Sequence, residues 1–197
     1  MAAAGFAQLS PRNTTGKGNE LKMGTALDRM NPEALGLEQV KKMISISAPE
    51  GYGKTTTLKR VIKLFDKNAE FKCVKKVVHA SPIKTGRFAG EVIAIYEWHG
   101  LVIGISTAGD STQVFIRNAH YFARYKCDFV IAPVRIGSNG RVLCVMKAHE
   151  KVVSYYNFRE VKFTFEKKCI SDAEQVLMAN SISEKAYLIL RELKRDI

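Results

Sequence analysis

The sequence has no apolar run that approaches the roughly 20 residues a membrane-spanning helix needs. Its first ten residues, MAAAGFAQLS, lack the charged start and the apolar run of a secretory signal peptide. We therefore expect no transmembrane segment and a cytoplasmic protein.

Cysteine and histidine motifs are also missing. The cysteines form no CxxC pair and no metal-binding spacing with histidine; they are Cys73, Cys127, Cys144 and Cys169. In a reducing compartment, we expect free thiols that pack as small apolar residues. The chain has no GxSxG and no HExxH motif, so serine-hydrolase and zinc-protease chemistry lack support.

Positive charge is abundant and unevenly distributed. The 197 residues carry a formal net charge of +12 and 46% of them are hydrophobic, enough for the core of one domain. Residues 1–38 are neutral overall, residues 39–89 carry +9 and residues 90–197 carry +3. A concentrated positive field attracts anions, so an anionic ligand is expected near residues 39–89. The alternative is a solvated lysine-rich face.

The chain divides into an arm and a core. Residues 1–30 are rich in small and polar residues without sustained periodicity, which predicts a flexible arm. Asn31 followed by Pro32 is a typical helix start, so a short helix is expected before residue 39. Residues 39–197 are expected to form one domain.

Within residues 39–197, apolar strand-like runs alternate with amphipathic segments. The pattern predicts strands at 41–47, 73–80, 129–134 and 161–166, a hairpin over 91–106 with its turn at His99-Gly100, and helices over 55–65 and 110–126. The capping box Ser181–Glu184 predicts the start of a C-terminal helix. The expected fold is three-layer α/β. Its sheet is mainly parallel but mixed, with residues 43–47 central and helices on both faces.

The segment APEGYGKT, residues 48–55, joins the first predicted strand to the first predicted helix. Gly51 and Gly53 allow backbone torsions that turn successive N–H groups inward and bring the chain close to a phosphate. The helix N-terminus adds its dipole. An ordinary strand–helix turn is the alternative.

This segment resembles the phosphate-binding loop of the P-loop NTPase superfamily, with Ala48 in place of the first glycine. The resemblance implies ATP or GTP as ligand, with Mg²⁺. It implies that Lys54 reaches the β- and γ-phosphates and that the Thr55 hydroxyl binds Mg²⁺. The nucleotide-binding residues are then Pro49, Glu50, Gly51, Tyr52, Gly53, Lys54, Thr55 and Thr56.

P-loop proteins usually place an aspartate at the end of a neighbouring strand, on the Mg²⁺ side. Here the apolar strand LVIGIS ends at Ser106 and Thr107, without an acid. Only the carboxyl ends of parallel strands face the loop, which excludes Asp128 and Glu97. We predict Asp110 as the Mg²⁺ or water-positioning group. Glu91 stays open as an alternative, and Asp110 as a simple helix cap is the other.

The segment STAGD, residues 106–110, also resembles the DTAG switch segment of small GTPases, which likewise follows an antiparallel hairpin. Ser106 replaces the aspartate, and no NKxD motif follows. A GTPase-like arrangement therefore remains open, without support for guanine specificity.

Three further basic residues are candidates for contact with phosphate. Arg135 follows a buried strand and is predicted to clamp a transferring phosphoryl group, the alternative being a surface arginine. Lys84 and Arg87 lie after the second strand, where small P-loop kinases often bind the phosphate acceptor. A mobile basic loop is the alternative there.

Two functions follow. The first is a Mg²⁺-dependent enzyme, a small ATP-dependent phosphotransferase or NTP hydrolase, with Lys54, Asp110 and Arg135 as catalytic residues. The second is a regulatory or GTPase-like nucleotide-binding module that acts with protein or nucleic-acid partners. Nucleic acid ranks second because the chain has no groove-reading motif and no aromatic–basic RNA motif.

Overall fold

The computed structural model describes residues 42–79, 90–155, 159–168 and 171–196. The predicted N-terminal arm and short helix, together with Lys84 and Arg87, lie outside the described residues. None of the described helices is long and apolar enough to cross a membrane.

Six strands form one mixed sheet in the order β2-β3-β4-β5-β1-β6. β3 runs antiparallel to the other five strands, which are parallel to one another. The strands are β1 (Lys42–Ala48), β2 (Lys72–His79), β3 (Glu91–Trp98), β4 (Leu101–Ser106), β5 (Phe129–Arg135) and β6 (Arg159–Thr164).

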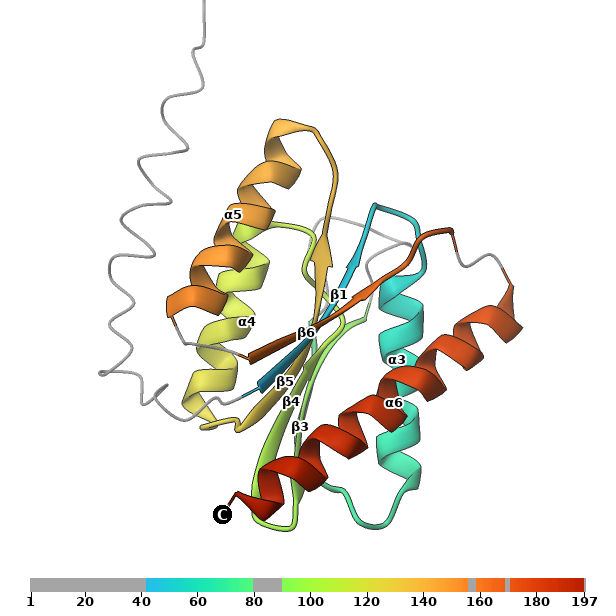
Figure 1. Ribbon diagram of the computed structural model, residues 1–197, viewed down its shortest axis with the longest axis vertical. Helices are drawn as coiled ribbons and strands as arrows, with labels where there is room; N and C mark the ends of the chain where they lie inside the picture. The colour runs from blue at the N-terminus through green and yellow to red at the C-terminus, as the bar shows by residue number, and fades with distance from the viewer. Residues whose placement is uncertain (1–41, 80–89, 156–158, 169–170, 197) are drawn as a thin grey trace, which may run out of the picture.

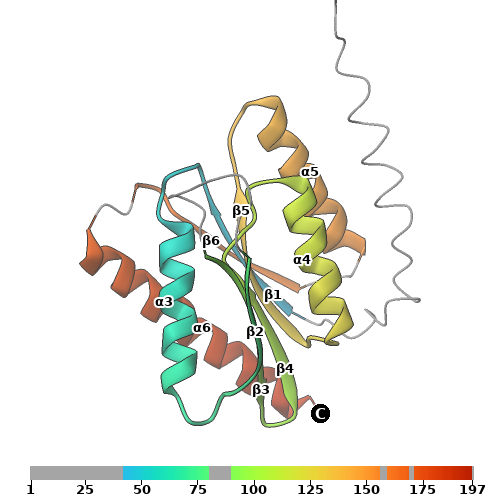
Figure 2. The same cartoon turned by 180° about the vertical axis from the view of Figure 1, so that it is seen from behind.

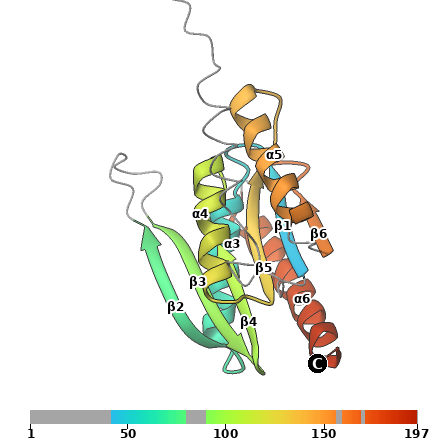
Figure 3. The ribbon, with the colours of Figure 1, turned by 90° about the vertical axis from the view of Figure 1, so that its left-hand side faces the viewer.

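In the part of the chain that the structure describes, two helices cover each face of the sheet (Figures 1 and 2). One face carries α3 (Lys54–Lys67) and α6 (Asp172–Arg195), and the other carries α4 (Thr112–Arg124) and α5 (Gly140–Tyr155). The predicted three-layer α/β arrangement with a mixed sheet is therefore observed. Figure 3 looks onto the sheet from the side of α4 and α5, with β2 and β3 on the left, bending away from β1.

Side chains of β1 point alternately to the two faces of the sheet and so contribute to the hydrophobic core on each face. Ile44, Ile46 and Ala48 pack toward α3 and α6, while Met43 packs toward α4 and α5. All seven residues of β1 are buried, as expected for a strand covered on both faces.

The predicted central position of residues 43–47 is wrong. The strand β1 is interior, but it lies next to the edge strand β6, and β5 separates it from β4. The order depends on pairing between segments far apart in sequence, which local patterns do not specify.

The predicted start of the last helix is also wrong. The helix α6 begins ten residues earlier, where the Ser171 hydroxyl and the Glu174 side chain form a capping box. Ser183 lies inside this helix and donates to the carbonyl of Ala179 at 2.8 Å. The helix α5 was not predicted at all.

The hairpin prediction is confirmed. Trp98 pairs with Leu101, and the turn residues His99 and Gly100 both have positive φ, 48° and 84°. Such torsions at both central positions match the right-handed twist of the flanking strands.

Candidate functional site

The 48–55 loop leaves the carboxyl end of β1 and leads directly into α3. Gly51 and Gly53 have φ values of 77° and 90°, in the left-handed region that disfavours other residues. A Cβ on Gly51 would meet nothing within 4 Å, so its torsion, rather than crowding, requires glycine. Gly53 is the N-cap of α3 and supplies no side-chain cap. The first backbone N–H groups of α3 are therefore left for another acceptor.

Lys54 is the first residue of α3 and is only 5% exposed. Its Nζ donates to the carbonyl oxygens of Ala48, at 2.7 Å, and Pro49, at 2.8 Å. Burial lowers the pKa of the Lys54 ammonium, and the Asp110 carboxylate opposes this by raising it. Neutral carbonyls compensate a buried charge only in part, so this ammonium is well placed to gain from an anion.

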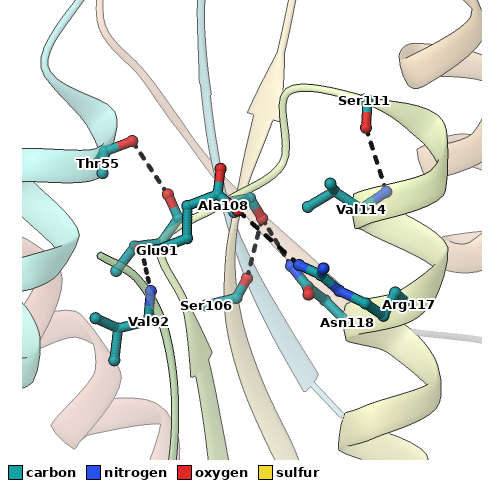
Figure 4. A network of polar contacts seen from close by, with 10 residues as sticks. Thr55, Glu91, Val92, Ser106, Ala108, Ser111, Val114, Arg117 and Asn118 are labelled. Carbon is teal, nitrogen blue, oxygen red and sulfur yellow. Dashed lines mark hydrogen bonds and ion pairs between the residues drawn. The ribbon is translucent and has the colours of Figure 1, made fainter. Parts of the chain in front are cut away.

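The next hydroxyl connects α3 to the end of β4. Thr55 Oγ1 donates to the carbonyl oxygen of Thr107 at 3.1 Å (Figure 4). Thr107 is fully buried and fixed on both sides: its N–H donates to Val92 O at 2.9 Å, and its Oγ1 accepts from Val92 N at 2.8 Å. The start of β3 thus anchors the segment that faces the loop.

Residues 107–110 pass close to β5. A Cβ on Gly109 would lie 1.9 Å from the backbone oxygen of Pro133, so only glycine fits. The buried Asn118 of α4 donates Nδ2 to Ala108 O at 2.8 Å. The sequence analysis missed Asn118. A polar residue between Phe115 and Phe122 on the apolar face of α4 was the available indication.

The carboxylates of Asp110 and Glu91 lie at this end of the sheet. Asp110 is close enough to Lys54 and Glu91 to affect the pKa of both. Burial raises the pKa of Glu91, with Arg117 opposing and Asp110 adding to that rise. Arg117 Nη2 lies 3.9 Å from Glu91 Oε2. Ser111, rather than Asp110, is the N-cap of α4, since its Oγ accepts from Val114 N.

Asp128 and Glu97, the two acids that the sequence analysis excluded, lie at the opposite end of the strands from the loop. Asp128 precedes β5 and accepts from Val102 N at 2.8 Å. Glu97 lies near the hairpin turn, 3.7 Å from Lys72 Nζ. Their exclusion from the loop side is confirmed.

Arg135 ends β5 beside the loop. It pairs in register with Ala48, and the following residue, Ile136, donates its N–H to Ala48 O at 3.2 Å. The Arg135 guanidinium contacts the Glu50 carboxylate, which belongs to the loop itself. Arg135 therefore lies at the loop but already has an anionic partner.

The remaining loop side chains differ in their surroundings. Tyr52 is partly buried and packs against the core between the sheet and α3, and Thr56 is exposed. Among the described residues, no three His, Cys, Asp or Glu side chains gather into a potential metal site. A cation here would need oxygen atoms from a bound ligand as well.

The loop also lies where ligands bind in open α/β sheets. From β1 the chain crosses to β2 over the α3 face, and from the adjacent β5 it crosses to β6 over the α5 face. Adjacent strands whose connections leave in opposite directions open a crevice at their carboxyl ends. Comparison with known proteins gives no match to a protein-family model, a curated protein or a solved structure.

Proposed function

We propose that this protein binds a nucleoside triphosphate together with Mg²⁺ at the 48–55 loop, in the manner of P-loop NTPases, and acts as a small phosphotransferase or NTP hydrolase. The observation that carries the proposal is the Lys54 ammonium. It is 5% exposed, and within the described part of the chain it donates hydrogen bonds to two neutral carbonyls. It begins a helix that follows two glycines with left-handed backbone torsions. A phosphate placed there would supply a negative charge in direct contact with this ammonium.

The chain fits a Mg²⁺–phosphate complex better than a bare ion. Mg²⁺ keeps near-octahedral oxygen ligands and is commonly held by one or two protein groups plus phosphate oxygens. Thr55 Oγ1 and the Asp110 carboxylate are the protein groups we assign to it, with Glu91 as the adjacent second acid. Mg²⁺ would neutralise charge that develops on a transferring phosphoryl group.

Arg135 is the residue we assign to the transferring phosphoryl group. Its guanidinium can bind phosphate in a bidentate fashion, provided that it leaves Glu50. The bond between Thr55 and Thr107 supports a second candidate, a GTPase-like regulatory module. In such a module, the Thr55 hydroxyl would bind the cation and lose its hydrogen bond to the Thr107 carbonyl. The 107–110 segment would then be free to move.

Titration of ATP, GTP and the corresponding diphosphates into wild-type and Lys54→Ala protein tests the proposal. Loss of a charge-assisted phosphate contact costs about 1.5–3 kcal/mol, or roughly ten- to a hundredfold in affinity. We expect that loss for triphosphates and a smaller one for diphosphates.

Lys63→Ala is the matched control, because Lys63 is an exposed lysine on the same helix. Melting curves verify folding of both variants. Equal triphosphate affinity in wild-type and Lys54→Ala protein would contradict the proposal. Release or transfer of a labelled terminal phosphate then separates hydrolysis from transfer, and its absence favours the regulatory module.

A further inference from the structure

A second candidate site lies at the opposite end of the sheet from the 48–55 loop. A cavity of about 470 Å³ opens beside the β3–β4 turn. In Figure 1 this turn lies at the bottom near the C-terminus, while the loop between β1 and α3 lies at the top. The cavity is lined by the α3–β2 connection, the hairpin turn and the last turns of α6.

Three basic side chains project from one stretch of α6 into this lining: Arg191, Lys194 and Arg195. Their spacing of three and four residues places them on one side of the helix. All three are exposed, and among the described residues that line the cavity Glu70 alone carries a carboxylate. The cavity therefore has a positive surplus.

Aromatic rings hold two of these cations in place. The Arg191 guanidinium lies 4.8 Å from the centre of the Tyr187 ring, and the Lys194 ammonium lies 5.5 Å from that of Trp98. The two rings meet at 66° with centroids 5.5 Å apart. Cations fixed over rings lose less freedom when they bind an anion, which favours affinity.

The one acid of the lining is itself engaged. Glu70 accepts from the Tyr187 hydroxyl and from Trp98 Nε1, the latter at 3.4 Å. These bonds, the Tyr187 bond foremost, lower the pKa of Glu70. Glu70 thus fixes the positions of the Tyr187 and Trp98 rings, and we expect Lys194 and Arg195 to be available to an external anion.

We propose that this cavity binds the phosphodiester backbone of single-stranded nucleic acid. A row of cations along a helix suits a chain of phosphates better than one phosphate, and exposed Lys67, at the end of α3, adds positive charge next to the segment that holds Glu70. The net charge of +12 adds long-range attraction. Trp98 is buried and Tyr187 is partly buried, so little ring surface is left for bases to stack on, and binding should depend weakly on sequence.

The chain contains one tryptophan, Trp98, and it lines the cavity. Its fluorescence therefore reports on binding there. We would titrate a 15-nucleotide dT oligomer at rising salt, following Trp98 fluorescence and the anisotropy of a labelled oligomer. The variants are Lys194→Ala/Arg195→Ala and, as control, Lys147→Ala, an exposed lysine on α5 across the sheet. Anisotropy is needed because loss of Lys194 alters the surroundings of Trp98.

We expect the double variant to bind the oligomer at least about tenfold more weakly, with a salt slope reduced by about 1.4 for two lost phosphate contacts on a single strand. Lys147→Ala and Lys54→Ala should bind like the wild type, so this result is separate from nucleotide binding at the loop. Absence of salt-dependent oligomer binding, or an equal loss in Lys147→Ala, would overturn the proposal. Equal binding of polyglutamate would assign the cavity to acidic proteins instead, and binding of dTMP alone would assign it to free nucleotides.

Discussion

The Thr55 hydroxyl donates a 3.1 Å hydrogen bond to the carbonyl of Thr107, across 52 residues of sequence. This bond joins the first turn of α3 to the segment that carries Asp110. If the Thr55 hydroxyl binds a cation through its oxygen, it can still donate its hydrogen bond to the Thr107 carbonyl. That hydrogen bond breaks if the 107–110 segment moves away. The role of this one contact is therefore open to direct measurement.

The first prediction concerns Thr55. Thr55→Val keeps the side-chain shape but removes the oxygen, so we expect Mg²⁺-dependent nucleotide affinity to fall about tenfold, the equivalent of one hydrogen bond of ordinary strength. Nucleotide binding in EDTA should change little. Thr55→Ser restores the oxygen and serves as control. An unchanged Mg²⁺ dependence in the valine variant would remove Thr55 from the cation.

The second prediction concerns Asp110. Asp110→Asn should reduce Mg²⁺-dependent turnover at least about tenfold, because charge placed at a phosphoryl centre is commonly worth a few kcal/mol. Metal-free nucleotide binding should survive. The variant should not uncap α4, since Ser111 holds that position.

A pH series extends this test. The Asp110 carboxylate raises the pKa of Lys54, so its removal should move the alkaline loss of nucleotide affinity to lower pH. Isothermal titration calorimetry of the nucleotide at a series of alkaline pH values would measure this change in affinity. A turnover rate and a pH profile that both match the wild type would contradict a role for Asp110 at the cation.

The third prediction concerns Gly109. A Cβ there would lie 1.9 Å from the Pro133 backbone oxygen, and backbone atoms cannot move aside as a flexible side chain can. We expect Gly109→Ala to cost more than about 2 kcal/mol of unfolding free energy. Gly140→Ala is the matched control, because a Cβ at Gly140 meets nothing within 4 Å. Urea unfolding of both variants measures the difference, and similar midpoints would contradict the close approach.

The fourth prediction concerns Glu160 of β6, which is partly buried. Burial would raise its pKa, but the contacts of His149 and Ser45 lower it from 4.5 to about 2. His149 Nε2 lies 2.8 Å from Glu160 Oε1, and the Ser45 hydroxyl donates to the same oxygen. The unfolded chain therefore binds this proton at higher pH than the folded chain does. Stability from Glu160 is present above pH 4.5 and is lost as pH falls toward 2.

Glu160→Gln should flatten this loss. The difference between 4.5 and about 2 corresponds to about 3–4 kcal/mol at most, and relaxation around the site will reduce it. Thermal melts of wild type and variant from pH 6 to pH 2 measure the effect. Glu166→Gln, at an exposed acid just after β6, is the control. Parallel curves for wild type and Glu160→Gln would show that the cluster does not contribute.

Most elements of the sheet could be predicted from local patterns, because a buried strand and an amphipathic helix each have their own period. The helix α5 could not. Apolar residues such as Leu143 and Met146 fill its outer faces and blur the stripe formed by Val142, Val145 and Val152. Its start was marked only by Asn139, whose side chain accepts from Val142 N at 3.0 Å.

The start of α6 shows a different limit. Ser171–Glu174 and Ser181–Glu184 both match a capping box, and the local sequence does not choose between them. Burial of Ala179 and Ile182 against the sheet makes the helix continuous through the second box. The choice therefore depended on tertiary packing. The candidate site followed the same rule: the positions of Lys54 and Asp110 could be predicted from sequence, whereas the contacts of Glu50, Gly109 and Asn118 required the strand order.

The pairing of β1 has a consequence for biosynthesis. Both neighbours of β1 come late in the chain: Met43 pairs with Val130 on one side and with Glu160 on the other. During synthesis from the N-terminus, the segment that carries the 48–55 loop thus emerges long before either strand that holds it. The loop can take its final shape only after β5 and β6 have left the ribosome, and until then the apolar β1 is exposed to chaperones and to aggregation.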